Sequence, residues 1–285
     1  MWQARGAMKP LRILPEDLAP GDARARDVDW STLRLERIGA AEHPLFERAY
    51  GRLWREFGAA GEMERREVIA ERLAWDRPVA GHTLRYELLA VLSGPEIVGL
   101  RDHTAIVPPR RPDGSRRVVV HLSHVVVEPA LRGGGLSGWL RALPLQLARE
   151  CAAAADGADD PITLVGEMEP ADGVTPAVMA RLRSYDRAGF LEVDPAVVRY
   201  HQPDFRPPAQ IDATSLRPVP LALVLRRVGD EAATSLRGDE LRELLTALYT
   251  MFGVHLRPED MAPLWSQLRA LPGPAASVPL LPLLR

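Results

Sequence analysis

Cysteine, lysine and asparagine are almost missing from this sequence of 285 residues. Cys151 is the one cysteine, which excludes an internal disulfide framework and a cysteine-based zinc site. Lys9 is the one lysine. Because a P-loop needs a lysine directly after its glycines to reach the phosphates, the P-loop nucleotide hydrolases are excluded as well. Asparagine is absent and arginine supplies nearly all the positive charge, a bias typical of a GC-rich bacterial genome.

An excess of charge of one sign and a long apolar run are also missing. The 36 basic residues nearly balance the 38 acidic ones, so no global field recruits nucleic acid or an acidic membrane. No stretch approaches the ~20 apolar residues of a membrane span, and the N-terminal sequence MWQARGAMKP contains no apolar signal-peptide region. We therefore expect a cytoplasmic protein with neither a nucleic-acid nor a membrane partner.

Hydrophobic residues make up 46% of the chain, enough for a buried core, and their spacing predicts a mixed α/β domain. We expect an irregular N-terminal arm over residues 1–31, the domain over 32–228, and a helical extension with a proline-rich tail over 229–285. Alternating apolar residues predict strands over 32–38, 86–92, 96–107, 118–127, 162–165, 190–193 and 220–228. Three- and four-residue spacings predict helices over 44–57, 63–73, 133–155, 176–188, 238–254 and 258–271. This order predicts a central meander of strands, not a regular βαβ series.

The sharpest local feature is the glycine-rich turn in Val125-Val-Val-Glu-Pro-Ala-Leu-Arg-Gly-Gly-Gly-Leu-Ser-Gly138, between a predicted strand and a predicted helix. Glycines let backbone N–H groups approach a ligand closely, and the start of a helix adds a positive dipole end. Ser137 adds a hydroxyl donor. The segment therefore predicts a site for a diphosphate.

The same glycines also match the dinucleotide-binding pattern G-x-G-x-x-G, through Gly133, Gly135 and Gly138. A lone match of this kind is weak. Five residues separate the glycines from the strand, and the acidic residue that should follow about 20 positions later has only a late counterpart, Glu167. A nicotinamide-dependent oxidoreductase is therefore the weaker interpretation.

Two motifs together resemble the GCN5-related N-acetyltransferase (GNAT) superfamily. Arg132-Gly-Gly-Gly-Leu-Ser137 resembles the Arg/Gln-x-x-Gly-x-Gly/Ala loop of that family, with serine in the last position. Tyr185-Asp-Arg-Ala-Gly-Phe190 matches its Tyr-x-x-x-Gly-Phe motif and follows after a predicted helix, strand and helix. The resemblance covers residues 32–228. It implies a mixed, mostly antiparallel central sheet flanked by helices, to which this chain adds a C-terminal helical extension.

The resemblance also implies a binding site for acetyl-CoA or a related short acyl-CoA as co-substrate. The residues implied in CoA binding are Val125, Val127, Arg132, Gly133, Gly134, Gly135, Leu136 and Ser137. The loop amides would hold the pyrophosphate, and the exposed backbone of the strand would pair with the pantetheine arm. The strands that begin at Val118 and Ile162 are expected to splay apart, opening a slot in which acyl group and amine meet.

Acyl transfer to an amine needs a base, oxyanion stabilisation and a proton for the departing thiolate. In this family the tyrosine of the second motif is the usual acid, which here is Tyr185; packing against the sheet is the alternative role. His121 and His124 are candidates for the base, with burial in the sheet as the alternative role of such a histidine. Glu167 and Glu169 are the rival candidates, since a carboxylate there could bind or deprotonate an ammonium substrate, or simply be solvated. Strand alternation places His121 and His124 on opposite faces unless a bulge intervenes.

The segment around these histidines, His121-Leu-Ser-His-Val-Val-Val127, resembles the paired-histidine strand of arylalkylamine acetyltransferases, with Ser123 in the place of the second histidine. The other histidines are scattered without metal-ligand spacing, so we expect no metal.

The sequence thus predicts an acyltransferase that moves an acetyl or short acyl group from CoA to a primary amine in a ternary complex. Cys151 falls within a predicted helix, away from the slot, and is a poor covalent relay. A non-catalytic acyl-CoA-binding or sensing protein is the alternative. The acceptor, a small-molecule or protein amine, and the formation of a homodimer stay open.

Overall fold

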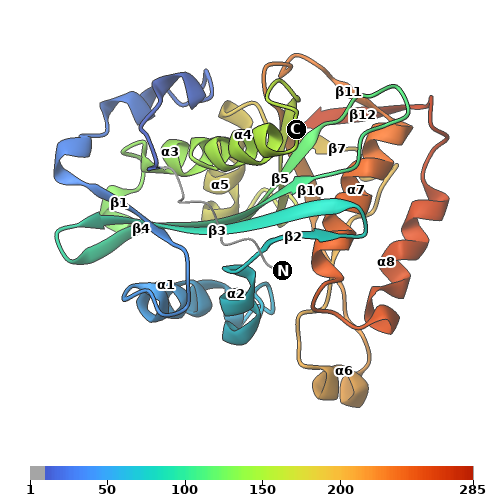
Figure 1. Cartoon of the computed structure of the whole chain (residues 1–285), viewed down its shortest axis with the longest axis horizontal. Helices are drawn as coiled ribbons and strands as arrows, with labels where there is room; N and C mark the ends of the chain where they lie inside the picture. The colour runs from blue at the N-terminus through green and yellow to red at the C-terminus, as the bar shows by residue number, and fades with distance from the viewer. Residues whose placement is uncertain (1–9, 285) are drawn as a thin grey trace.

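One large mixed sheet runs through the computed structural model, which describes residues 10–284 (Figure 1). The first nine residues of the predicted N-terminal arm, among them Lys9, and Arg285 lie outside the described residues. The strands of the sheet are β1 (Arg34–Ile38), β2 (Asp76–Val79), β3 (His82–Ser93), β4 (Glu96–Val107), β5 (Val118–Val127), β6 (Ile162–Met168), β7 (Leu191–Val193), β10 (Ala222–Arg227), β11 (Ser235–Arg237) and β12 (Ser277–Pro282).

The strand order is β1-β3-β4-β5-β6-β10-β7-β12-β11, with β2 also paired to β3. The pairs between these strands are antiparallel, except for β5 and β6, which run parallel. The predicted fold class, a mostly antiparallel mixed sheet flanked by helices, is therefore confirmed. Within residues 10–284, no helix has the length and apolarity of a membrane span.

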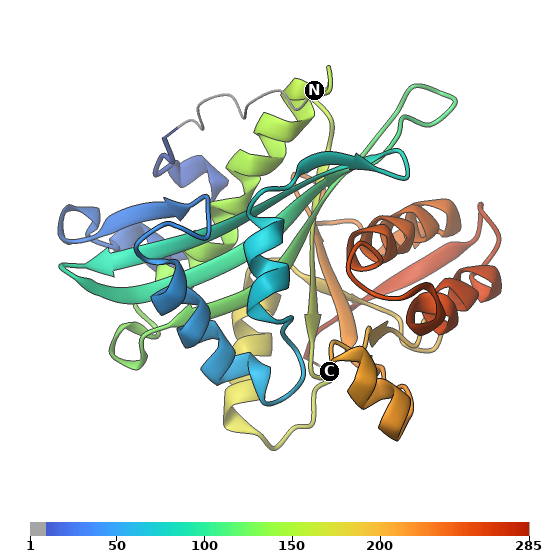
Figure 2. The same ribbon diagram turned by 60° about the horizontal axis from the view of Figure 1, so that its bottom comes forward.

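Helices cover both faces of the sheet (Figures 1 and 2). They are α1 (Phe46–Leu53), α2 (Arg66–Arg72), α3 (Leu136–Ala142), α4 (Pro144–Ala154), α5 (Pro176–Arg187), α6 (Pro208–Thr214), α7 (Gly238–Phe252) and α8 (Pro258–Ala270). Side chains of α1, α2 and α7 form one core with the sheet, and those of α4 and α5 form another on the opposite face. The apolar residues of α7 that are buried in the first core include Leu241, Leu244, Leu245, Leu248 and Phe252.

Two elements differ from the prediction because of prolines. The helix expected over 133–155 is two helices, α3 and α4, since Pro144 has no N–H to continue the helical hydrogen bonds. The proline-rich tail, for which the sequence analysis names no strand, contains β12, which pairs with both β7 and β11. Its prolines, Pro279 and Pro282, hide the two-residue period of a strand. β12 therefore lies within the large sheet.

The pairing between β5 and β6 is short. It extends only from Val118 to His121 on β5, opposite Ile162 to Val165 on β6. Beyond these residues β5 stays paired with β4 up to Val127, and β6 stays paired with β10 up to Met168. The two strands therefore separate toward their carboxyl ends, as expected from the resemblance.

A β-bulge interrupts β5 just where this separation begins. Arg101 on β4 pairs with Val125, whereas His103 pairs with Leu122, so two residues of β5 lie opposite Asp102. The extra residue changes which face the later side chains occupy. Val119 and Val126 consequently belong to the same core. Simple alternation across His121 and His124 is thus wrong, and both histidines lie on one face.

The N-terminal arm is ordered and packs against the glycine-rich turn. It contains short 3-10 helices, and the carbonyl of Ala25 accepts a hydrogen bond of 2.6 Å from the indole Nε1 of Trp139 on α3. Gly135 adopts a φ of +93°, and a Cβ at this position would lie 2.2 Å from the backbone oxygen of Arg24. Gly135 therefore serves both the turn and the close approach of the arm.

A matched pair of alanine substitutions tests this packing. Gly133 also has a positive φ, +79°, but a Cβ there would meet nothing within 4 Å. Gly133→Ala should cost about 1 kcal/mol in the free energy of unfolding, from backbone strain alone. Gly135→Ala should cost about 3 kcal/mol or more, because the new methyl group displaces the arm. Urea unfolding measures both, and equal losses would contradict the packing of Arg24 on Gly135.

Candidate active site

A cavity of about 670 Å³ opens where β5 and β6 separate. Its walls are the carboxyl ends of these two strands, α5, the glycine-rich turn and the segment that joins α1 to α2. Phe205 and the last residue of α7, Phe252, close one side. The cavity therefore lies at the slot that the splayed strands were expected to form.

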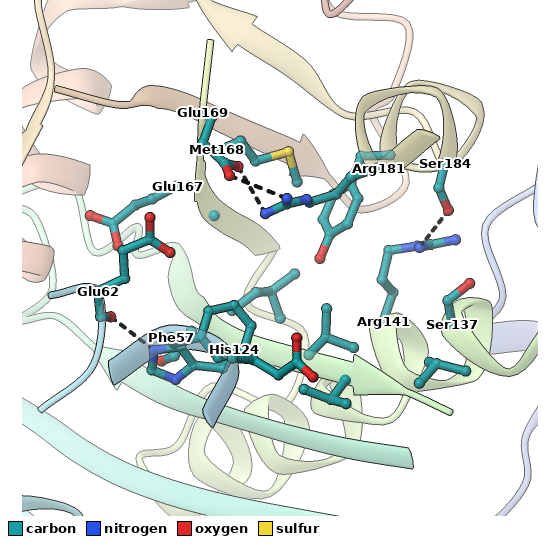
Figure 3. Close-up of a pocket in the computed structure, with 18 of the residues that line it drawn as sticks. Phe57, Glu62, His124, Ser137, Arg141, Glu167, Met168, Glu169, Arg181 and Ser184 are labelled. Atoms are coloured by element: carbon teal, nitrogen blue, oxygen red, sulfur yellow. Dashed lines mark hydrogen bonds and ion pairs between the residues drawn. The ribbon is translucent and has the colours of Figure 1, made fainter. Parts of the chain in front are cut away.

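Charges of opposite sign line the two ends of this cavity (Figure 3). Arg141, Ser137 and Ser184 lie at the end formed by α3 and α5. Glu62 and Glu167 lie at the other end, which we call the acidic end. The cavity thus offers an anion site and a cation site on either side of the strand separation.

Several of the residues implied in CoA binding line the cavity: Val125, Val127, Arg132, Gly133 and Ser137. Gly134, Gly135 and Leu136 do not line it. Gly135 faces the N-terminal arm, and Leu136 is only 3% exposed and packs in the core. The separation from β6 leaves the edge of β5 at Val125 and Val127 without a neighbouring strand, so its backbone groups are available to an extended ligand.

Tyr185 lies in the wall of the cavity, near the end of α5. The helix ends as the sequence predicts: Gly189 takes a left-handed φ of +77°, and the N–H of Phe190 bonds to the carbonyl of Tyr185 at 3.1 Å. The ring of Phe190 packs edge-on against that of Tyr185, with their centroids 4.8 Å apart. The turn thereby holds the phenol in one orientation.

Two arginines surround the phenol of Tyr185. Nη1 of Arg101 on β4 donates to the hydroxyl oxygen at 3.4 Å, and the guanidinium of Arg141 lies over the ring, 5.0 Å from its centroid. Arg101 is 0% exposed, and its Nε and Nη2 have no hydrogen-bond partner within residues 10–284. Burial alone would raise the pKa of Tyr185, but the charges of Arg101 and Arg141 lower it below the ordinary value.

His121 is held between two side chains of the acidic end. Its Nε2 donates to Oε2 of Glu167 at 3.0 Å, and its Nδ1 lies 3.1 Å from the hydroxyl oxygen of Ser123. Glu167 also accepts hydrogen bonds from Tyr200 and Gln202, which belong to the segment between β7 and α6. With Nε2–H directed at the carboxylate, Nδ1 is the basic nitrogen of the ring.

His124 has a different role, because both of its ring nitrogens face acceptors. Nδ1 donates to the carboxylate of Asp102 at 3.1 Å, and Nε2 donates to the carbonyl of Glu62 at 3.0 Å, which is possible only for an imidazolium. Burial would lower the pKa of His124, but the charge of Asp102 raises it to about 9. His124 therefore anchors the bulge and the Glu62 segment and is not free to accept a proton.

The structure adds residues that the sequence analysis missed. Arg101 and Asp102 stand in the middle of the buried strand β4, a charged pair where an apolar period was expected. Two adjacent charged residues within a predicted buried strand are the sequence signal for these two site residues. Glu62, Tyr200 and Gln202 gave no comparable signal, because they reach the cavity only through the folding of long loops. No cluster of His, Cys, Asp and Glu suited to a metal ion occurs in the described part of the chain.

The Asp102–His124 pair predicts how stability depends on pH. The folded pKa of His124 lies above its ordinary value of 6.5, so its contribution to stability is fully present below pH 6.5 and is lost as the pH rises through 9. Between these limits the free energy of unfolding should fall by up to about 3 kcal/mol. Urea unfolding of the wild type and of His124→Gln at a series of pH values measures this fall. If the free energy of unfolding had the same slope against pH in both proteins, His124 would be neutral in the fold.

Comparisons with known proteins match only solved structures; no family model and no curated protein matches the chain. One match is an aminoglycoside acetyltransferase from an uncultured soil metagenomic sample, 15% identical over 54% of this chain and 87% of that one, with a TM-score of 0.32. A second match is an acetyltransferase of the GNAT family from Streptococcus pneumoniae, 14% identical over 68% of this chain and 99% of that one, with a TM-score of 0.35. A third is a ribosomal-protein-alanine N-acetyltransferase from Brucella melitensis, 16% identical over 54% of this chain and 90% of that one, with a TM-score of 0.29.

Proposed function

We propose that the protein is an acyltransferase of the GNAT type, which transfers an acetyl or short acyl group from acyl-CoA to a primary amine. The observation that carries this proposal is the cavity at the separation of β5 and β6, with arginines at one end, carboxylates at the other, and Tyr185 and His121 in its walls. Such an arrangement suits a polyanionic donor and a cationic acceptor that meet at one point.

The donor would bind along β5 and the glycine-rich turn. Gly133 and Ser137 at the start of α3, together with Arg132 and Arg141, supply the amides and charges that suit a pyrophosphate. The free edge of β5 suits the amide groups of pantetheine, which would extend the sheet by one strand. When bound, acyl-CoA supplies a thioester, whose carbon is open to attack by an amine.

The acceptor ammonium must lose a proton before it can attack. His121 is the base that the geometry favours, since Nδ1 is available and Glu167 stabilises the imidazolium that forms. The hydroxyl of Ser123, which also lines the cavity, lies 3.1 Å from Nδ1 and would pass the proton on. His124 does not take this role because its nitrogens are already occupied by acceptors.

Tyr185 would return a proton to the departing thiolate. In the transfer, the C–N bond of the amide forms, the C–S bond of the thioester breaks, and the sulfur takes the phenolic proton. The proton that the amide nitrogen loses then restores the phenol. An unperturbed phenol, with a pKa of about 10, gives its proton reluctantly to a thiolate whose acid has a pKa of about 8.5. Arg101 and Arg141 reduce this mismatch because they stabilise the phenolate.

Direct transfer is favoured over a covalent acyl-enzyme. Cys151 is buried in α4, and burial raises the pKa of its thiol to about 12, so it does not provide a thiolate near neutral pH.

Acetyl-CoA-dependent release of thiol in the presence of a panel of primary amines tests the function. Tyr185→Phe should lower kcat by roughly 100-fold, the lower end of general acid catalysis, with little change in the Kd for CoA. Arg101→Gln should lower kcat in the wild-type background but add nothing to Tyr185→Phe, because it acts through the phenol. Tyr50→Phe, which removes a hydroxyl outside the cavity, is the control.

Full turnover by Tyr185→Phe would make Tyr185 a packing residue. Binding of acetyl-CoA without release of thiol from any amine would favour the sensing alternative, and binding of NADH in its place would favour an oxidoreductase.

The base is tested by the pH profile of kcat/KM. His121→Ala should remove the fall in activity on the acid side, because the group that must lose its proton is gone. Glu167→Gln should lower kcat less than His121→Ala does, since it removes only the charge that supports the imidazolium. An acid limb that persists in His121→Ala but vanishes in His124→Gln would assign the base to His124 instead.

A further inference from the structure

The acidic end of the cavity contains carboxylates whose charge the protein does not balance. Glu169 is paired with Arg181 at 2.8 Å, and Glu64 is paired with Arg72. Glu62 has no ion pair with any residue of the described chain. Glu167, whose side chain is only 5% exposed, is bonded to a histidine, a tyrosine and a glutamine, none of them a permanent cation.

Glu62 and Glu167 lie at the same end of the cavity (Figure 3), and the charge of Glu167 acts on Glu62. Burial raises the pKa of Glu62, and the negative charges of Glu169 and Glu167 raise it as well, whereas the charges of Arg181 and His124 lower it. A cation placed between Glu62 and Glu167 would relieve this repulsion. Neither of these two carboxylates forms an ion pair with an arginine or lysine of the described residues.

A second observation, the unpartnered amide oxygen of Gln202, points to the same ligand chemistry. Gln202 lines the cavity and is 6% exposed, and its Nε2 donates to Oε2 of Glu167 at 3.3 Å. Because Glu167 accepts at that position, the amide cannot turn, and Oε1 is left buried with no donor among residues 10–284. A buried acceptor without a donor is costly. An ammonium N–H of a bound ligand would satisfy it.

We propose that the acceptor is an amine with at least two positive charges and no carboxylate, such as a di- or polyamine, whose ammonium groups lie between Glu62, Glu167 and Gln202. This proposal rests on the proposed function, because it names the class of substrate for the same cavity. One amine reacts after His121 has taken its proton, and the second charge remains against the carboxylates. The carboxylate of an amino acid would be repelled by the same groups.

Three probes of equal carbon-chain length separate these classes: 1,4-diaminobutane, n-butylamine and 4-aminobutanoate. With acetyl-CoA as donor, kcat/KM should be roughly tenfold higher for the diamine than for the monoamine, and lowest for the amino acid. Glu62→Gln should bring the ratio of diamine to monoamine close to one. Glu67→Gln, an exposed carboxylate on α2 outside the cavity, is the matched control and should leave the ratio unchanged.

Calorimetric titration of the diamine into the protein with CoA present gives a readout that does not need turnover. Diamine binding that Glu62→Gln weakens, without thiol release from any amine, would support the cation site and contradict the catalytic function. Thiol release with n-butylamine or 4-aminobutanoate as the preferred acceptor would support the catalytic function and contradict the cation site. Absence of diamine binding by calorimetry, or an unchanged ratio in Glu62→Gln, would overturn the proposal.

Discussion

The early end of the β5–β6 pairing is the constraint on which the rest of the site depends. Each strand keeps its other neighbour, so the separation costs only the hydrogen bonds between the two diverging ends. In return, one edge of β5 is left free along a cavity in the middle of the sheet. The neighbouring strands hold this geometry in place, because β5 stays paired with β4 and β6 stays paired with β10. A ligand that pairs with the free edge of β5 restores the hydrogen bonds that the fold leaves open.

The bulge in β5 is stabilised by a buried ion pair that the core would not otherwise favour. Asp102 is fully buried in β4, and it accepts hydrogen bonds from the backbone N–H and the imidazolium of His124 and from the hydroxyl of Tyr86. These partners offset the desolvation of the carboxylate. Arg101, its neighbour in the chain, has only the hydroxyl of Tyr185 as a partner in the described structure. Hydrogen bonds thus satisfy the buried carboxylate of Asp102, whereas the buried guanidinium of Arg101 acts on the phenol of Tyr185.

The N-terminal arm contributes to the same region from outside the sheet. Asp22 of the arm bonds to Nη2 of Arg141 at 2.5 Å, and Nη1 of Arg141 bonds to the hydroxyl of Ser184 on α5. These bonds fix the guanidinium over the ring of Tyr185. Because the arm also packs on Gly135, it fixes the position of the glycine-rich turn relative to the phenol of Tyr185.

The sequence by itself determined the elements whose signals are local. The period of β5, the left-handed Gly189 that ends α5 and the glycine-rich turn all depend on residues close together in the chain, where backbone conformation is decided by neighbours. The tertiary structure alone decided what those elements do together. A bulge opposite Asp102 brought His121 and His124 to one face, although the sequence shows only their spacing. The meeting of Glu62, Glu167 and Gln202 depends on how distant loops pack, and no local period records such contacts.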